Sequence, residues 1–416
     1  MKKIQTIVML LLLAVPVIVT AQTKEILYKF GGFVEFKSYF DDYRSRTSRY
    51  DLQYKYPLSP NMNDDGIDIN KSNSLNYSIA ASRLTFSVAG MKFLNADVNT
   101  YVEADFLGSG ESYIGMFNLR HIYMNFKWKK SALLLGQTNH LTHVSEVSSN
   151  MVGFGSGYPF NTLNRGMQVR YEVMLSENMK FLAAAEMYSG HKSLGPASAQ
   201  AQSGIPDLHA QIKLGNANKI FGGATFGYKF FKPRNTDGNN NPISTTVSAF
   251  DVSLFAKAVI GRGFSVKLWG IYGENLSMYN MLGGYGKLAY TASEPLDFDY
   301  SNLRTLSTWA EFETPSYKNF NFGLFYGYQK NCGTKDKLDT SASGANYLYF
   351  SDQKMEWFSR VSPRITYSLS KKLIFGLEYN LTFAKWSKSV DANLKPLTSF
   401  DVNHNNRLEF MAKLNF

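Results

Sequence analysis

The sequence predicts an all-β fold, a transmembrane antiparallel β-barrel of about sixteen strands with short periplasmic turns and long extracellular loops. Three observations favour this fold class. Apolar and polar residues alternate in segments from one end of the 416-residue chain to the other. The connections between these segments alternate between short and long, and the last segment runs to an aromatic residue at the C-terminus.

The first residues of the chain are expected to form a signal peptide. Lys2 and Lys3 precede an almost wholly apolar stretch at residues 7–19, and small residues follow up to Ala21. A basic start, an apolar centre and a small-residue cleavage site are typical of secretory signals. The sequence therefore predicts a signal peptide over residues 1–21, cleaved near Ala21, and a single barrel domain over residues 22–416.

The alternating segments have the period of two that a strand with one apolar face requires. In MQVRYEV, residues 167–173, apolar residues fall on the odd positions and polar residues on the even ones. The chain is also 15% aromatic, a composition that favours strands. Sixteen strands are predicted near residues 27–40, 74–89, 97–107, 115–127, 131–138, 166–175, 179–190, 207–215, 219–234, 245–260, 264–279, 303–313, 320–332, 354–368, 372–386 and 406–416.

The connections sort into two kinds. Short turns such as SEN at 176–178 and GRG at 261–263 alternate with long connections such as 41–73 and 139–165, and only the turn near 90–96 breaks the rule by being loose. Short turns at one end and long loops at the other describe a transmembrane barrel, whereas a soluble sandwich has no reason to sort its loops this way. Both termini are then expected at the short-turn, periplasmic end.

The chain ends on RLEFMAKLNF, residues 407–416, in which every second residue up to Phe416 is apolar. Chain ends usually fray unless another element holds them. We therefore expect this strand to pair with the first one and to close the barrel. A last strand that ends in phenylalanine also resembles the signal read by the outer-membrane insertion machinery, which is an expected partner through Phe416.

Charge and cysteine content exclude other classes of protein. The formal net charge is +11, but lysine and arginine are scattered and form no basic run, so nucleic-acid binding is not predicted. The single cysteine, Cys332, cannot form an internal disulfide. A 22-stranded transporter with a plug domain does not fit this length.

Strand parity assigns charged side chains of both signs to the interior, where the two signs nearly cancel. A dry core would not tolerate them, whereas a water-filled lumen would. The predicted pore-lining residues from parity are Arg83, Glu103, Asp105, Arg170, Glu172, Arg360, Arg364 and Glu378. Arg120 shares the parity of the lipid-facing Ile122 and Met124, so either a bulge resets the phase there or Arg120 lies at the headgroup level.

The connection at 139–161, NHLTHVSEVSSNMVGFGSGYPFN, is the predicted constriction of the lumen. Its three glycines between residues 153 and 157 permit tight folding, and Tyr158 with Pro159 would stiffen its return, so Tyr158 joins the predicted lining. The alternative is a loop that decorates the rim of the barrel.

Reactive groups are sparse. His140, His143 and Glu146 have a spacing that could gather a metal on one helical turn, but without a fourth ligand we interpret them as polar loop residues. Ser156 lies among glycines without a partnering base, so no catalytic residues and no enzymatic activity are predicted.

Residues 61–72, NMNDDGIDINKS, half match a calcium-binding loop. Asn61, Asn63, Asp65 and Gly66 fit, but Ser72 stands where the bidentate glutamate belongs. A solvated acidic loop is favoured, and loosely bound calcium at Asn61, Asn63 and Asp65 is the alternative. No other cofactor or metal is predicted.

Several segments resemble the DcaP-like trimeric porin family of outer-membrane proteins. They include FGGFVEFKSYFDDYRS (30–45), TYVEADFLG (100–108), LRHIYMNFKW (119–128), LLLGQTNHLTH (133–143) and YGENLSMYNMLGGYG (272–286). The resemblance spans nearly the whole mature chain and implies a homotrimer of sixteen-stranded porins with inward-folded loops and a constriction lined by arginines such as Arg83, Arg120 and Arg364. Members often begin with a coiled-coil segment, which has no counterpart here. The implied partners are the lipid bilayer, lipopolysaccharide and two further copies of the chain.

The predicted function is passive diffusion of small hydrophilic solutes across the outer membrane of a Gram-negative bacterium. One alternative is a channel that prefers small anions, motivated by 44 lysines and arginines against 33 acidic residues. Another is a non-conducting barrel that serves as an adhesin or structural scaffold, which would have a plugged lumen.

Overall fold

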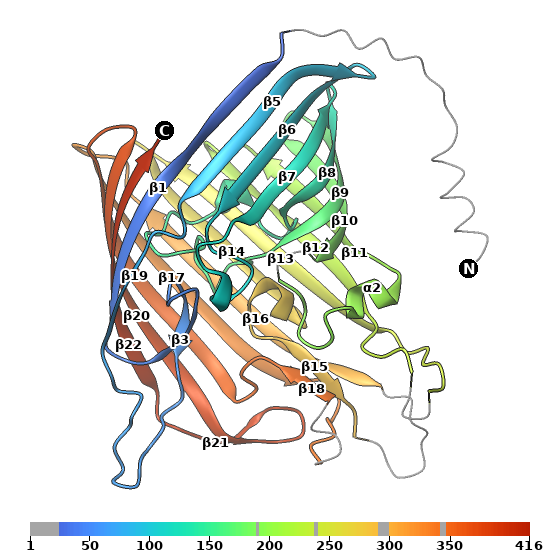
Figure 1. Cartoon of the computed structure of the whole chain (residues 1–416), viewed down its shortest axis with the longest axis vertical. Helices are drawn as coiled ribbons and strands as arrows, with labels where there is room; N and C mark the ends of the chain where they lie inside the picture. Colours follow the sequence, from blue (N-terminus) through green and yellow to red (C-terminus); the bar gives the residue numbers. More distant parts are fainter. Residues whose placement is uncertain (1–24, 189–190, 237–239, 290–298, 342–346) are drawn as a thin grey trace.

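The computed structural model describes residues 25–188, 191–236, 240–289, 299–341 and 347–416, and the predicted signal peptide lies outside these ranges. Within them, sixteen long antiparallel strands form one closed barrel, as predicted (Figure 1). Its strands are β1 (Leu27–Asp41), β5 (Arg83–Phe93), β6 (Ala96–Asp105), β7 (Asn118–Lys127), β8 (Ser131–Asn139), β9 (Arg165–Ser176), β10 (Met179–Tyr188), β11 (Asp207–Gly215), β12 (Ile220–Phe231), β13 (Val247–Ile260), β14 (Phe264–Glu274), β16 (Tyr300–Glu313), β17 (Phe320–Thr334), β19 (Met355–Ser368), β20 (Leu373–Val390) and β22 (Asn403–Asn415).

The last strand closes the barrel on the first. β22 pairs with β1 in a ladder that runs from Asn415 opposite Phe33 to Arg407 opposite Asp41. Phe416 continues the pairing, because its backbone N–H donates to the carbonyl of Gly32 at 3.1 Å and its carbonyl accepts from the Gly32 N–H at 3.3 Å. The predicted role of the C-terminal strand is confirmed, and no sheet edge is left free where the ends of the barrel meet.

The apolar residues of the alternating segments face outward, as predicted from their parity. On β9 the odd-numbered Met167, Val169 and Tyr171 are 56%, 54% and 46% exposed, while Gln168 between them is buried. Such a band of exposed aliphatic and aromatic side chains belongs against lipid in an outer-membrane barrel. In the described part of the chain, no helix is both long and apolar enough to cross a membrane.

The connections sort by length as predicted, with two local corrections. The turn expected to be loose is a tight two-residue hairpin, in which Leu94 and Asn95 have φ of +47° and +62°, the conformation of a type I′ turn. The predicted strand 264–279 ends earlier, because Asn275 turns left-handed with φ of +43° and begins the 3₁₀ turn η3 (Leu276–Tyr279).

The predicted strand 74–89 is also interrupted. It forms β4 (Ser74–Ser78) and β5, with residues 79–82 outside both ladders. The remaining short elements lie in the long connections. They are β2 (Ser45–Ser48), β3 (Gln53–Pro57), η1 (Glu111–Tyr113), η2 (Ser145–Val147), α2 (Ala199–Ser203), β15 (Gly284–Lys287), β18 (Leu348–Phe350) and β21 (Pro396–Ser399).

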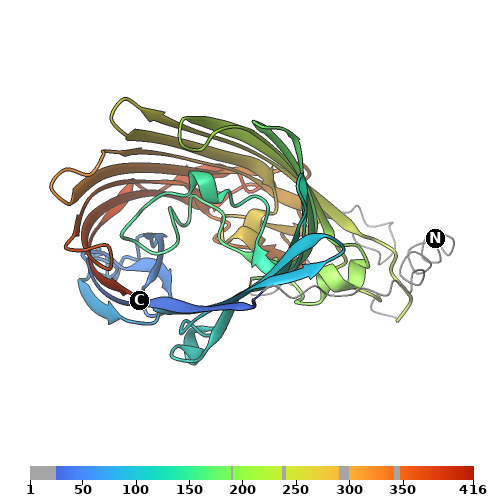
Figure 2. The ribbon, with the colours of Figure 1, turned by 90° about the horizontal axis from the view of Figure 1, so that it is seen from above.

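Chain segments from the long connections fold into the barrel. Residues 140–164, which we call the lumenal loop, lie inside the ring of strands (Figure 2). The β2–β3 hairpin and η3 also contact inward-facing side chains, and the three segments share one apolar cluster through Phe160, Tyr56 and Met278. Because this cluster includes the inward Trp269 and Trp309, one side of the interior is filled by protein, and the open space lies on the other side.

Candidate functional site in the barrel lumen

Charged side chains of the barrel wall hold the tip of the lumenal loop. Glu378 on β20 accepts hydrogen bonds from the backbone N–H groups of Val152 at 2.8 Å and Gly153 at 3.1 Å. Lys37 on β1 donates to the carbonyl oxygen of Val152. The tip is therefore fixed between two neighbouring parts of the wall by charge-assisted hydrogen bonds, which are stronger than neutral ones.

The return of the loop is anchored by packing and by an arginine. The ring of Phe160 lies 5.1 Å from that of Phe358 and 6.1 Å from that of Phe325. Arg360 donates from Nη1 to the carbonyl of Tyr158 at 3.0 Å, and all these side chains are buried. The predicted inward course of residues 139–161 thus has both polar and apolar attachments to the wall.

Two cavities remain beside the loop. The outer cavity, of about 650 Å³, is lined from the long-loop end, and the inner cavity, of about 530 Å³, reaches the short turns at Ser316 and Ser368. Phe154, near the tip of the lumenal loop, lines both of them. Phe154 is therefore the residue that the two cavities share.

Arg120 faces the interior, which settles the two alternatives left by the sequence. The register between β6 and β7 shifts opposite Arg120, where Glu103 pairs with His121 and Ala104 with Leu119. This bulge turns Arg120 inward while Ile122 and Met124 remain exposed outside. Arg120 Nε lies 2.6 Å from Oε1 of Glu103, and its Nη1 lies 2.6 Å from Oδ2 of Asp105.

Three further predicted lining residues lie on the same side of the barrel. Arg83 borders the inner cavity, is 28% exposed at its side chain and lies 3.3 Å from Glu103. Arg170 donates from Nη2 to the carbonyl of Asn139 at 2.6 Å. Glu172 pairs with Lys180 at 2.9 Å near the short-turn rim. The structure therefore brings Arg83, Glu103, Asp105 and Arg120 together and places Arg170 and Glu172 apart from them.

The other four predicted residues lie beneath the lumenal loop. Arg364 is buried and pairs with Glu311 at 2.8 Å, and Arg360, Glu378 and Tyr158 contact the loop backbone or belong to it. Neither the outer nor the inner cavity is lined by any of these four. They fix the loop in position.

The outer cavity has cationic lining that the sequence analysis missed. Arg49, Arg165 and Lys192 line it together with Arg120, and none of the aspartates and glutamates in the described ranges does. Arg49 lies in a long connection and Lys192 in another, where parity carries no information. The only available signal was the general excess of basic residues.

Two side chains of the half-matched calcium loop, those of Asn63 and Asp68, accept hydrogen bonds from the backbone of the loop itself. The side-chain oxygen of Asn63 accepts from the backbone N–H groups of Asp65 and Ile67, at 3.1 and 2.8 Å. Asp68 accepts from the backbone N–H of Asn61 at 2.9 Å. These contacts are those of an Asx turn in a polar loop, the reading that the sequence favoured.

His140, His143 and Glu146, which have helical spacing in the sequence, contact different partners in the structure. Glu146 pairs with Lys213 at 2.8 Å, and Nε2 of His143 lies 3.2 Å from the hydroxyl of Ser148. His140 points instead to Glu186 on β10, with Nδ1 2.9 Å from Oε2. The three side chains at this spacing therefore contact different partners and do not converge on one point.

The pKa values of two half-buried histidines predict a pH dependence of stability. Burial lowers the pKa of both His143 and His191 to about 4, and the charge of Arg165 lowers it further in each case. An unfolded histidine titrates near ~6.5, so the unfolded chain binds more protons between these values. Stability is then full above about pH 6.5 and falls as the pH drops toward about 4.

We expect the urea midpoint of unfolding to fall between about pH 7.5 and pH 5, and to fall less in His143→Asn than in the wild type. The control is His404→Asn, because His404 is exposed on β22. An identical fall in His143→Asn and the wild type would show that His143 does not contribute.

The barrel is similar to known outer-membrane proteins. The sequence model of the DcaP outer membrane protein family matches residues 18–214. The crystal structure of the outer membrane channel DcaP of Acinetobacter baumannii is similar with a TM-score of 0.67 at 17% identity, covering 95% of this chain and 99% of that chain. No curated protein matches the chain in sequence.

Two other solved porins share the fold. An anion-selective porin from Comamonas acidovorans has a TM-score of 0.56 at 10% identity, covering 94% of this chain and 100% of that chain. OmpT of Vibrio cholerae, in its trimer form, has a TM-score of 0.55 at 10% identity over the same shares of the two chains. At these identities the structures establish the barrel architecture.

Proposed function

We propose that this barrel is an outer-membrane channel of the DcaP family, and that it lets small hydrophilic solutes diffuse passively through a lumen narrowed by the lumenal loop. Porin families are typically non-enzymatic and lie in the outer membrane of Gram-negative bacteria. We propose further that three copies assemble, as the trimer form of the similar Vibrio protein illustrates. The predicted signal peptide would direct the chain to export.

One observation carries this proposal. The outer cavity lies toward the long loops and the inner cavity toward the short turns, and Phe154 is the residue that lines both. The tip of the loop that bears Phe154 is attached to the wall, because Lys37 donates to the carbonyl of Val152 and the carboxylate of Glu378 accepts from the Val152 N–H. An attached loop beside an open path is what a porin needs, since it limits solute size without closing the lumen.

The test is single-channel conductance of the protein in a planar bilayer. We expect ohmic current steps that appear in threes if the channel opens as a trimer. Protein that is folded, as judged by its resistance to unfolding in cold SDS, and yet gives no current would favour the non-conducting scaffold instead.

A preference for small anions is the second candidate, because the outer cavity has cationic and no anionic lining. Inside the lumen the acidic residues are largely paired: Glu103 and Asp105 with Arg120, and Glu311 with Lys267 and Arg364. Strand parity assigned nearly equal numbers of acidic and basic side chains to the interior. Because many of the acidic ones are paired, these numbers do not give the charge that a solute in the lumen would encounter. Rings of one charge sign select ions of the other sign.

We expect Arg49→Gln combined with Lys192→Gln to move the reversal potential in a salt gradient toward zero. Both residues line the outer cavity, and salt screens their charges for ions in that cavity only beyond the Debye length of about 8 Å at physiological salt. Arg44→Gln is the control, because Arg44 is exposed and does not line this cavity. A wild-type reversal potential of zero would contradict the anion preference.

A further inference from the structure

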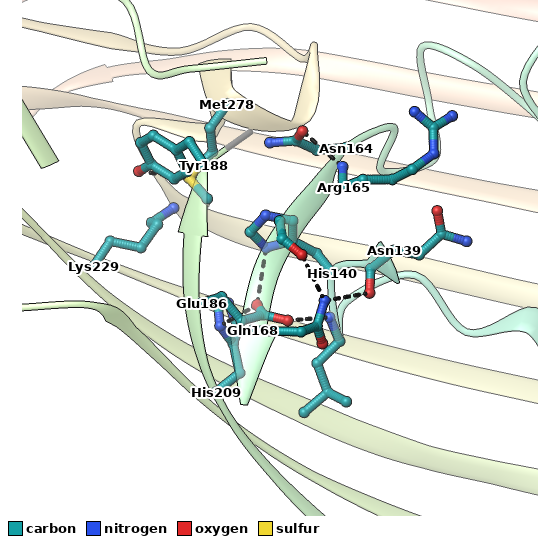
Figure 3. Close-up of polar contacts among 12 residues, drawn as sticks. Asn139, His140, Asn164, Arg165, Gln168, Glu186, Tyr188, His209, Lys229 and Met278 are labelled. Carbon is teal, nitrogen blue, oxygen red and sulfur yellow. Dashed lines mark hydrogen bonds and ion pairs between the residues drawn. The ribbon is translucent and has the colours of Figure 1, made fainter. Parts of the chain in front are cut away.

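A buried cluster of two imidazoles and one carboxylate lies where the lumenal loop begins. His140 follows the last residue of β8, Glu186 lies on β10 and His209 on β11, and all three side chains are fully buried (Figure 3). Nδ1 of His140 lies 2.9 Å and Nδ1 of His209 lies 2.8 Å from the same oxygen, Oε2 of Glu186. The three donor atoms all lie within 4.8 Å of one another.

These atoms converge without satisfying one another. Both Nδ1 atoms and Oε2 of Glu186 are buried, and among the described residues none of them has a partner with hydrogen-bond geometry. Buried polar atoms are normally paired, so a convergent unpaired set in the same place needs an explanation. A cation bonded to all three lone pairs would satisfy every one of them.

The surroundings orient the three groups toward a common centre. Oε1 of Glu186 accepts from the backbone N–H of Leu141 at 3.1 Å, which leaves Oε2 to point at the histidines. Nε2 of His209 lies 3.0 Å from the hydroxyl of Tyr279, whose oxygen lies 3.3 Å from Oδ2 of Asp251. Metal-ligating groups are commonly held by such outer contacts, which fix the ring orientation.

The charged side chains around the cluster would also be balanced by a bound cation. Three acidic residues, Glu186, Asp207 and Asp251, are fully buried here. Two cations face them, since Arg170 lies 3.8 Å from Oε1 of Glu186 and Lys229 lies 3.2 Å from Oδ2 of Asp251. With both histidines neutral, the acidic charge exceeds the basic charge by one.

We infer that His140, Glu186 and His209 form a binding site for one divalent first-row transition-metal ion, for which Zn²⁺ is the natural probe. Two imidazole nitrogens and one carboxylate oxygen are a ligand set that Zn²⁺ accepts, with bonds of about 2.0–2.2 Å. The ion joins the start of the lumenal loop to two strands of the wall and so stabilises the loop against displacement.

The experiment measures metal retained by untagged, folded protein. The wild type is stripped with a chelator, incubated with Zn²⁺, desalted and analysed for metal by mass spectrometry. We expect one Zn²⁺ per chain, with loss of this ion in Glu186→Gln and in His209→Gln. The matched control is His121→Gln, because His121 also lies on the inner wall but contacts Thr138 and belongs to no such cluster. Resistance to unfolding in cold SDS establishes that each variant has folded.

A second readout separates a metal site from a purely structural network. Zn²⁺ should raise the thermal midpoint of the stripped wild type and of His121→Gln, and should leave that of His209→Gln unchanged, because only a folded state that binds the ion is stabilised by it. Folded wild-type protein that retains no Zn²⁺ would overturn the inference. Retention that is equal in the wild type and in both cluster variants would overturn it too, since the ion would then lie elsewhere.

Discussion

Phe154→Ala is expected to raise the single-channel conductance several-fold, and Phe154→Trp is expected to lower it. Phe154 lines both the outer and the inner cavity, and we propose that the junction between the two lies there. The narrowest segment of a pore dominates its resistance, and a change of side-chain volume there has a larger effect than the same change in a wide vestibule. Conductance steps in symmetrical salt give the measurement.

Phe117→Ala is the matched control for this prediction. Phe117 carries the same side chain, lines the outer cavity only and is 67% exposed. Its removal widens the vestibule and should leave the conductance close to that of the wild type. If Phe154→Ala and Phe117→Ala changed the conductance equally, the junction at Phe154 would not be the constriction, and the resistance would have to lie at another point of the lumen.

Much of the barrel follows from local sequence pattern. The period of two fixes which face of each strand is apolar, and lipid on one side with water on the other leaves one orientation that satisfies both. This is why the parity of Met167, Val169 and Tyr171 identified the outer face, and why the alternation up to Phe416 predicted the closing strand.

The alternation of apolar and polar residues no longer predicts which side of the wall a side chain faces where the strand pairing is irregular. Arg120 and Ile122 have the same parity but face opposite sides, because one extra residue is accommodated between them in the β6–β7 ladder. No residue type at this point of the sequence predicts the bulge. What stabilises it is the pair of carboxylates that Arg120 reaches once it has turned inward, and these come from a different strand.

The contacts between the lumenal loop and the barrel wall could not be predicted from the sequence, for a related reason. The glycines of the lumenal loop indicated where the chain folds inward, but Glu378, which holds its tip, lies on a strand far along the sequence. The same holds for His140, whose sequence neighbours His143 and Glu146 turn elsewhere while Glu186 and His209 arrive from β10 and β11. Contacts between distant strands depend on barrel closure and register, which single-sequence spacing does not contain.

Arg120→Met is expected to lower the free energy of unfolding by about 3–5 kcal/mol, the usual effect of removing one partner of a buried ion pair. Arg120 is 6% exposed and is the shared partner of Glu103 and Asp105, which are 8% and fully buried respectively. Methionine fills most of the volume but leaves two carboxylates close together in the wall without that cation. The measurement is equilibrium unfolding in urea, with the folded barrel in detergent or lipid.

Arg83→Met is the comparison variant. It removes the same charge from a partner of Glu103, but from a side chain that is less buried than that of Arg120. Arg83 also pairs with Glu103, at 3.3 Å, but its side chain is 28% exposed at the edge of the inner cavity, where water screens the pair. Its loss should lower the free energy of unfolding by at most about 1 kcal/mol, the range measured for exposed pairs. If Arg120→Met were no more destabilising than Arg83→Met, water would screen Glu103 and Asp105 as it screens Arg83, and the outer cavity that Arg120 lines would extend to both carboxylates.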